Sequence, residues 1–509
     1  SFVKPSTMRR IYFFFALLLC TVQLLGNNIQ VDNISLAGQD TDGGFTFVQF
    51  DLSWENSWRI SVGPANWDAA WVFVKYRVNG NNWLHATINT TGAIAPAGVD
   101  INVTSDQRGA FVHRSTDGSG DVDWDNIQLR WNYDEDGVDD NALVDVQVFA
   151  IEMVYVPQDT FQIGTGVPFF IDEDTQNEIG EFYTRAQVGP FVFSVPYQVG
   201  SEAAITIDNT IGNLYYSNSD PGSEAGDQVG PIPAAFPKGF NAFYCMKYET
   251  SQDQWIGFFN TLSQTQKMAL DITGPEGKNS DDEFIRNAIS WLDAGNATTT
   301  NPDVPVSYVA SSFALAYLDW SGLRPMTELE YEKACRGTLA PVPNEFAWGN
   351  FNIHPSTYTY ANEGSPQEAI TNPGSGAGNC LYQNTNGTPS GPKRCGIVAA
   401  SALLNNREET GGSYYGIMEM SGNLYERAVT VGTPEGRIFT GLHGDGAITN
   451  AGAANVVGWT TNTNTFLGFR GGGYPNGDQF IRVSDRNDAA LDFSGTNGRI
   501  GFRGVRTAE

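Results

Sequence analysis

Between residues 27 and 150, apolar and polar residues alternate in short runs that are separated by turn-forming residues. An alternation with a period of two is typical of half-buried strands, and this region has no helical periodicity. Strands at this spacing predict an all-β sandwich for residues 27–150. The predicted strands are 45–54, 70–78, 83–88, 110–114, 126–131 and 143–151.

Tryptophan is concentrated in the same region. Aromatic side chains bury a large area, so we expect most of these residues in the core. An exposed platform on which sugar rings stack is the alternative. The tryptophans are Trp54, Trp58, Trp67, Trp71, Trp83, Trp124 and Trp131.

No Gly/Ser-rich linker follows this region, so residues 151–509 are expected to join it rigidly. Residues 159–237 are acidic, glycine-rich and without periodicity, which predicts an insertion lying on the surface. Helical patterns then appear at 248–260, 306–320 and 328–336, capped by Thr250 or Ser251, by Ser311 or Ser312, and by a Thr327–Glu330 capping box. Strands followed by a mixed, loop-rich region predict an α+β chain.

The last forty or so residues are rich in Gly, Asn, Asp and Ser and predict irregular loops between two anchoring strands, 469–471 and 501–506. Arg482 and Arg486 are expected to be structural. Loops held by a scaffold often bind ligands, so the polar residues between the anchors are the predicted ligand-binding surface. The alternative is a closing loop without a ligand. The predicted surface residues are Tyr474, Asn476, Asp478, Gln479, Asn487 and Asp488.

The chain of 509 residues carries 57 acidic and 29 basic residues, a net charge of −28. Such a chain repels a phosphate backbone, which argues against nucleic acid as a partner. A carboxylate-rich surface suits cations that prefer oxygen ligands, and it also serves simple solubility.

Met8-Arg-Arg precedes an apolar run at 11–25 and then Gly26, the order of a secretory signal. We expect translation to start at Met8, residues 1–7 to lie upstream, and cleavage after residue 26. No later apolar run is long enough to predict a membrane span. The sequence therefore predicts an exported protein, secreted or at the cell surface.

Four cysteines follow the predicted signal, and an exported protein can form disulfides. Cys380 and Cys395 flank a loop rich in Gly, Pro and Asn and are the predicted pair, whereas Cys245 and Cys335 lie in apolar stretches and are expected to be buried thiols. With four histidines and no His-x-His spacing, no zinc or iron site is recognised.

Asp134, Asp136 and Asp139 place oxygens around a glycine turn and resemble half of a calcium loop. The third member of the pattern and the distal Glu are missing. A charged β-turn between two strands is the favoured alternative.

At Arg324-Pro-Met-Thr-Glu-Leu-Glu-Tyr-Glu-Lys-Ala-Cys-Arg-Gly, the chain resembles a motif of the formylglycine-generating enzyme, or sulfatase-modifying factor, family. Companion motifs follow in family order. They begin at Glu152, Tyr248, Phe346, Tyr415 and Arg470, and end with Gly-Phe-Arg at 501–503. The resemblance covers residues 151–509 and implies a C-type-lectin-like fold with structural calcium. The calcium ligands that it implies are Asn423, Leu424 and Glu426; alternatively, Glu426 pairs with an arginine.

The resemblance does not extend to the family's chemistry, which uses copper held by two cysteines in the segment after the glycines. Residues 474–481 contain no cysteine, and Asn476 stands near the first expected one. Only a thiolate supplies the soft ligand that copper(I) prefers. The iron-dependent relatives take ligands from a histidine-bearing helical domain, which 27–150 does not resemble. No Gly-x-Ser-x-Gly elbow supports Ser–His–Asp chemistry.

Three functions remain open. The first is an exported, non-catalytic recognition or structural protein that binds a glycan, a cell surface, a partner protein or copies of itself. The second is a formylglycine-generating or related metal-dependent oxidase with an unrecognised site. The third resembles the variable ligand-binding proteins of diversity-generating retroelements, because the Asn and Asp residues of the C-terminal segment are types that adenine-targeted mutagenesis leaves.

Overall fold

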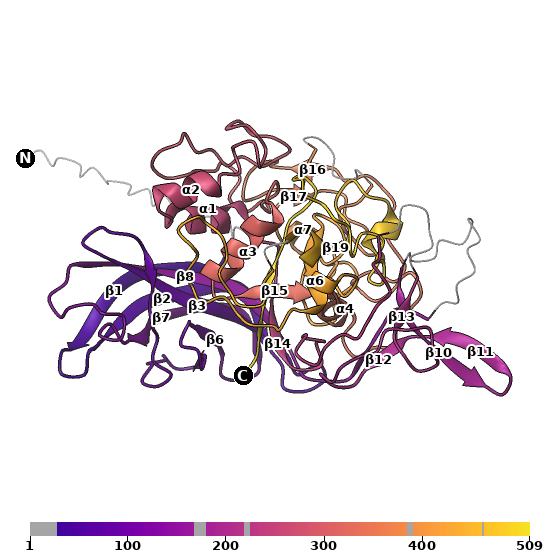
Figure 1. The fold of residues 1–509 in the computed structure, drawn as a ribbon. Helices are drawn as coiled ribbons and strands as arrows, with labels where there is room; N and C mark the ends of the chain where they lie inside the picture. Colours follow the sequence, from indigo (N-terminus) through magenta and orange to yellow (C-terminus); the bar gives the residue numbers. More distant parts are fainter. Residues whose placement is uncertain (1–27, 167–179, 218–223, 384–389, 461–462) are drawn as a thin grey trace, which may run out of the picture.

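A ten-stranded sheet forms the centre of the molecule (Figure 1). The computed structural model describes residues 28–166, 180–217, 224–383, 390–460 and 463–509, so the predicted signal segment lies outside the described residues. The strand order is β19-β18-β15-β20-β14-β8-β3-β6-β5, with β4 paired to β3. These strands are β3 (Asp68–Val78), β4 (Leu84–His85), β5 (Val99–Val103), β6 (Ala110–Arg114), β8 (Val144–Val156), β14 (Phe243–Met246), β15 (Arg324–Thr327), β18 (Glu426–Val429), β19 (Leu467–Arg470) and β20 (Gly504–Thr507).

A second sheet, of β1 (Gln30–Asp40), β2 (Phe45–Arg59) and β7 (Gly118–Trp131), lies at the N-terminal end of the chain (Figure 1). Alternate residues of β2 are buried, which is the pattern the sequence predicted. One apolar cluster takes residues from both sheets: Val48, Phe50 and Leu52 of β2, and Ala70, Val72 and Val74 of β3. The intervening residues of β3, Ala69, Trp71 and Phe73, enter the main core instead, so this strand is buried on both faces.

Strand β8 runs through the predicted domain boundary at residue 150. Val144–Val154 pairs with β3 along one edge, and Met153–Val156 pairs with β14 along the other. Because one strand belongs to both regions, residues 27–150 and the rest of the chain share a continuous sheet, which accounts for the absence of a linker.

The helices are few, in keeping with the predicted α+β class. α4 (Glu328–Arg336) begins with the capping box expected at Thr327, and α1 (Gln252–Asn260) begins at Ser251, one of its two predicted N-caps, which also forms a capping box. The capping prediction for α3 (Ser311–Trp320) is wrong, because its N-cap is Ala310, which has no polar side chain. The remaining helices are α2 (Gln264–Ala269), α5 (Ile397–Ser401), α6 (Pro434–Arg437), α7 (Thr463–Phe466) and the 3-10 helix η1 (Asp478–Ile481). Within the described ranges, no helix is both long and apolar enough to span a bilayer.

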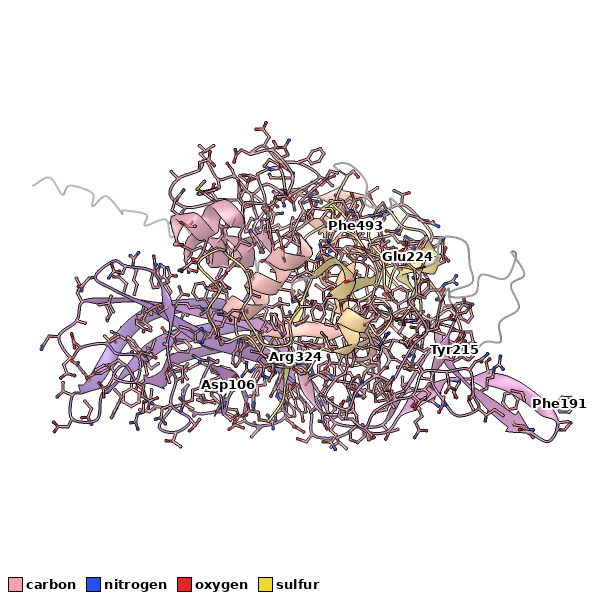
Figure 2. All side chains as sticks on the ribbon, in the orientation of Figure 1. Asp106, Phe191, Tyr215, Glu224, Arg324 and Phe493 are labelled. Atoms are coloured by element: carbon pink, nitrogen blue, oxygen red, sulfur yellow. The ribbon has the colours of Figure 1, made fainter. Side chains whose placement is uncertain are left out.

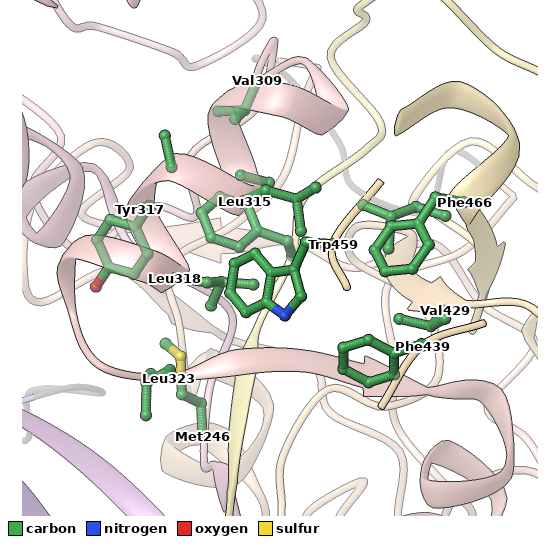
Figure 3. Packing of buried hydrophobic residues seen from close by; sticks show 14 of the residues in the cluster. Met246, Val309, Leu315, Tyr317, Leu318, Leu323, Val429, Phe439, Trp459 and Phe466 are labelled. Carbon is green, nitrogen blue, oxygen red and sulfur yellow. The ribbon is translucent and has the colours of Figure 1, made fainter. Parts of the chain in front are cut away.

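The main core packs α1 and α3 against the sheet, and Figure 3 shows part of it around Leu318 and Trp459. Residues of the supposed surface insertion, including Phe182 and Tyr216, are fully buried in this core. The prediction that this segment only covers the surface is therefore wrong. Its strands are β9 (Phe161–Ile163), β10 (Phe182–Val188), β11 (Phe191–Val195), β12 (Tyr197–Val199) and β13 (Tyr215–Tyr216); a small hairpin, β16 (Tyr360–Ala361) and β17 (Ala369–Ile370), follows later.

Tryptophan residues of the N-terminal region lie in or against the core. Trp54, Trp71 and Trp131 are at most 1% exposed, and the other four are partly buried.

Candidate functional site

Helix α4 presents a row of buried carboxylates. Glu330 accepts two hydrogen bonds from Arg324, at 2.8 and 2.6 Å, and also closes the capping box with the Thr327 amide. Glu332 lies 2.9 Å from Arg336 and 3.0 Å from Arg470. These side chains are at most 1% exposed, so the repeated Glu and Arg positions of the motif form an internal ion-pair network.

The C-terminal arginines complete this network. Arg486 makes a two-point contact with Glu328, at 2.6 and 3.0 Å, and donates to the carbonyls of Gly180 and Ala225. Arg482 donates to Asn344 Oδ1 and pairs with Asp478. Both arginines are buried, as expected of structural residues.

The predicted anchors of the C-terminal segment are also buried. Gly471, Gly472 and Gly473 lie inside, and Phe502 and Arg503 are at most 1% exposed. Strands β19 and β20 hold the two ends of the segment in the central sheet. The segment is therefore fixed to the scaffold at the positions that the sequence indicated.

The loop between these anchors is less open than expected. Tyr474 is only 6% exposed and packs in an apolar cluster with Tyr358 and Leu424. Asn476 Oδ1 accepts a hydrogen bond from the Gly473 amide.

The other predicted surface residues are partly buried. Asp478 pairs with Arg482, Tyr425 Oη donates to Asp488 at 2.8 Å, and Asn487 donates to the same carboxylate. Gln479 is partly buried as well. The predicted polar patch with an exposed aromatic plane is thus wrong for Tyr474, and most of its polar groups bond to neighbouring residues.

The turn before β18 carries the predicted calcium ligands. Asn423 Nδ2 donates to Glu249 Oε2 at 2.6 Å, and Asn423 Oδ1 accepts from the Lys393 amide. The Leu424 amide donates to Glu249 Oε1 at 2.8 Å. Both polar atoms of the Asn423 side chain are therefore already engaged within the protein.

Glu249, Glu419 and Glu426 form a buried carboxylate cluster beside this turn. Burial raises the pKa of all three carboxyl groups, that of Glu419 to about 7, and the charges of Glu426 and Glu419 raise the pKa of Glu249 further. Arg503 lies 2.5 Å from Glu426 Oε1 and opposes these shifts. Arg503 contacts only Glu426 in this cluster, and the charges of Arg503 and Arg394 partly oppose the raised pKa of Glu419.

Among the described residues, two oxygens of this cluster have no hydrogen-bond donor: Glu419 Oε2 and Glu426 Oε2. Glu419 and Asn423 both adopt left-handed backbone conformations, with φ of 55° and 62°. Such conformations cost free energy for residues with a Cβ and are enriched at functional sites. Sequence reasoning missed Glu249 and Glu419, although both lie inside the motifs that begin at Tyr248 and Tyr415.

The weaker acidic loop in the N-terminal region has a structural role. Asp136 accepts hydrogen bonds from the Thr87 amide, the Thr87 hydroxyl and Trp131 Nε1. Asp134 and Asp139 stand on either side of this turn. In the described part of the chain, no group of three or more His, Cys, Asp or Glu side chains is arranged to hold a metal ion.

The predicted disulfide is wrong. Cys380 and Cys395 are both free thiols and buried. Cys380 packs among Phe346, Trp348 and Tyr382, whereas the Cys395 thiol faces the Glu249 carbonyl. The two cysteines therefore lie in different surroundings, which their separation in sequence could not reveal. Cys245 and Cys335 are buried free thiols, as predicted.

Comparison with known proteins shows the family of this chain. Residues 202–508 match the sulfatase-modifying factor enzyme 1-like domain. The chain belongs to this family. Formylglycine-generating enzymes of cattle and mouse are each 30% identical, over 166 and 231 residues, which are 29% and 42% of this chain. The enzyme of Thermomonospora curvata is 41% identical over 56 residues, 11% of this chain.

The aligned parts span 43%, 59% and 18% of the cattle, mouse and Thermomonospora enzymes. The chain thus covers less than two thirds of each of these relatives. The ion-pair network of α4 and the C-terminal arginines lies within the residues that match the family.

Proposed function

We propose that this protein is an exported, non-catalytic recognition or structural member of the sulfatase-modifying factor family. It would combine an N-terminal β-sandwich with a C-type-lectin-like domain and bind a glycan, a cell surface or a protein partner. The apolar cluster shared by two sheets supports the sandwich. The chemistry of the C-terminal segment supports the absence of the family's copper reaction.

The observation that carries the proposal is the state of the cysteines. Residues 474–481 contain no cysteine, and Asn476, near the first expected position, bonds to its own loop. The four cysteines in the described residues are buried, and burial raises the pKa of each thiol, that of Cys335 to about 12. A thiolate is the form that binds copper, and burial disfavours the thiolate at all four positions.

A peptide assay tests this proposal. The purified protein, loaded with copper(I) and supplied with oxygen, is incubated with a cysteine peptide of the kind that formylglycine-generating enzymes accept, and the products are followed by mass spectrometry. We expect no conversion above a sample without protein, while a known formylglycine-generating enzyme run in parallel converts the peptide. Conversion by this protein would establish the alternative, a metal-dependent oxidase with an unrecognised site.

We further propose that a calcium ion binds at the turn before β18, with ligands that differ from those first expected. Asn423 is engaged on both sides of its amide, whereas Glu419 and Glu426 each keep one carboxylate oxygen without a donor. Hard cations take such oxygens, together with backbone carbonyls and water. Glu419 would therefore hold the ion with Glu426, and the Leu424 carbonyl is the remaining candidate from the predicted set. The ion would neutralise the excess charge of the buried carboxylate cluster.

Thermal unfolding with and without a chelator tests the site. Calcium that binds only the folded state stabilises it by about 2.7 kcal/mol at a concentration of 100 Kd. We expect the chelator to lower Tm and added calcium to restore it. Glu419→Gln should abolish this response, whereas Glu276→Gln, at an exposed position, should keep it. A chelator-insensitive Tm in the unaltered protein would refute the proposal.

A further inference from the structure

The hairpin of β10 and β11 projects from the body of the molecule (Figure 1), and Phe191 lies at its tip (Figure 2). Its end carries exposed apolar side chains instead of the polar residues usual on a projecting turn. The exposed fractions are 66% for Val188, 72% for Phe191, 50% for Val192 and 41% for Phe193. An apolar group of this kind, held away from the core, indicates an interaction surface.

The edge of this hairpin is open for strand pairing. In its sheet the order is β11-β10-β13, so β11 has a hydrogen-bonded neighbour on one side only among the described strands. An edge strand presents unpaired amides and carbonyls that can template a further strand. Residues 182–200 also contain no Asp or Glu, and Arg185 is their one charged residue, in a chain with a net charge of −28. The hairpin is therefore suited to an acidic partner surface.

Strand β1 lies at the end of the molecule opposite the hairpin (Figure 1), and the surface beside it carries a slot. β1 is the edge strand of its sheet, and a cavity of about 280 Å³ lies between it and the start of β8. Leu36 pairs with the fully buried Val48 and so points into the layer between the sheets, yet it is 39% exposed. The slot is lined by apolar and aromatic residues, among them Leu36, Trp131 and Val144, and to a similar extent by polar residues, among them Gln39, Thr46, Asp139 and Asp140.

The size of the slot favours side chains over a free small molecule. Pockets for drug-sized ligands usually span about 300–1,000 Å³, so this cavity lies below that range. It has room for one or two aromatic side chains. The two aspartates supply the negative charge that suits the hairpin.

We propose that the β10–β11 hairpin of one copy docks against the β1 edge of a second copy, with Phe191 or Phe193 entering the slot and Arg185 facing Asp139 and Asp140. The donor and acceptor surfaces differ and lie at opposite ends of the molecule, so the contact is head-to-tail. When a head-to-tail contact is repeated, the copies form a closed ring if the rotation between them closes, and an open chain if it does not. The protein therefore assembles into chains or rings. This assembly is independent of whether the protein is catalytic.

Sedimentation analysis over a range of protein concentrations tests the assembly. The unaltered protein should form a series of species larger than a dimer. A donor variant, Phe191→Asp with Phe193→Asp, should associate at least about thirtyfold more weakly, as expected when central aromatic contacts are lost. Phe351→Asp, which changes a 66% exposed phenylalanine elsewhere, is the matched control and should assemble normally.

Mixing variants separates head-to-tail docking from other modes. An acceptor variant, Leu36→Glu, should also associate more weakly than the unaltered protein, with its folding checked by circular dichroism. The donor variant keeps an intact slot and the acceptor variant keeps an intact hairpin, so an equal mixture should give a dimer and nothing larger. In the same way, copies with Phe191→Cys and copies with Leu36→Cys should form a disulfide with each other, because the four native cysteines in the described residues are buried.

Several results would overturn the proposal. They are an unaltered protein that stays monomeric at all concentrations, a donor variant that assembles like the unaltered protein, and a mixture of variants that yields no dimer. Binding of the hairpin to lipid vesicles without self-association would assign it to a membrane instead.

Discussion

Replacing Arg486 by alanine gives the sharpest test of the ion-pair network, because this side chain joins three separate segments. It is fully buried, contacts both oxygens of Glu328, and donates to the carbonyls of Gly180 and Ala225. Its guanidinium also lies 4.0 Å from the ring centroid of Phe182. Removing one partner of a buried ion pair costs about 3–5 kcal/mol, and each carbonyl left without a donor adds about 1 kcal/mol. Arg470 still pairs with Glu328 and offsets part of this loss. We therefore expect Arg486→Ala to lower the free energy of unfolding by about 4 kcal/mol.

Urea denaturation followed by tryptophan fluorescence measures this change. With a slope of about 2–3 kcal/mol per molar, the midpoint should fall by about 1–2 M. Arg77→Ala is the matched control, because Arg77 and Asp145 form a 2.7 Å ion pair whose side chains are 37% and 53% exposed. Pairs of this kind contribute about 0.2–1 kcal/mol. If both variants lost the same small amount, Arg486 would not be structural, and it would become a candidate for binding an anionic ligand.

Three further predictions concern other buried groups. A thiol reagent should leave the four described cysteines unmodified in the folded protein and react with all four after unfolding. If only two cysteines reacted after unfolding, the Cys380–Cys395 disulfide would be present after all. Burial raises the pKa of Asp319 to about 6, so the folded state holds this proton more tightly than the unfolded chain, and its contribution to stability is present below about pH 4 and lost as the pH rises through 6. In urea titrations from pH 4 to 7, Asp319→Asn should therefore show a smaller fall in stability than the unaltered protein, and equal slopes would contradict this. Glu426→Gln, like Glu419→Gln, should remove the response of Tm to calcium; a retained response would exclude Glu426 as a ligand.

Short sequence patterns correctly predicted the strands and helices whose formation depends on neighbouring residues in the chain. The alternation of 45–54 and the capping box at Thr327 led to β2 and α4 because each pattern reports directly on its own backbone. β1 was not predicted, because its own sequence carries no such pattern. Most of its residues are exposed, and it lacks the alternation that marks a half-buried strand. Its position depends on pairing with β2, which only the folded chain provides.

Spatial relations were harder to predict. The polar residues of the C-terminal loop were expected at the surface because of their type, but Asp488 and Asn487 bond to neighbouring side chains. Cys380 and Cys395 were paired because they flank a loop, and sequence spacing carries no information on which core each side chain enters. Glu419 was not proposed as a ligand from the sequence, because only the structure shows that one of its oxygens lacks a donor among the described residues.

The family match and the proposed interface occupy different parts of the chain. Residues 202–508 match the family. Within them, the motif residues of α4 and the C-terminal arginines form buried ion pairs with one another. Both halves of the proposed docking contact, the slot beside β1 and the β10–β11 hairpin, lie before residue 202. A scaffold supports many functions, and function depends on the sites built on it. The proposed assembly therefore depends on residues that lie before the family match, whereas the loss of the copper reaction that we propose depends on the cysteine-free segment 474–481 within it.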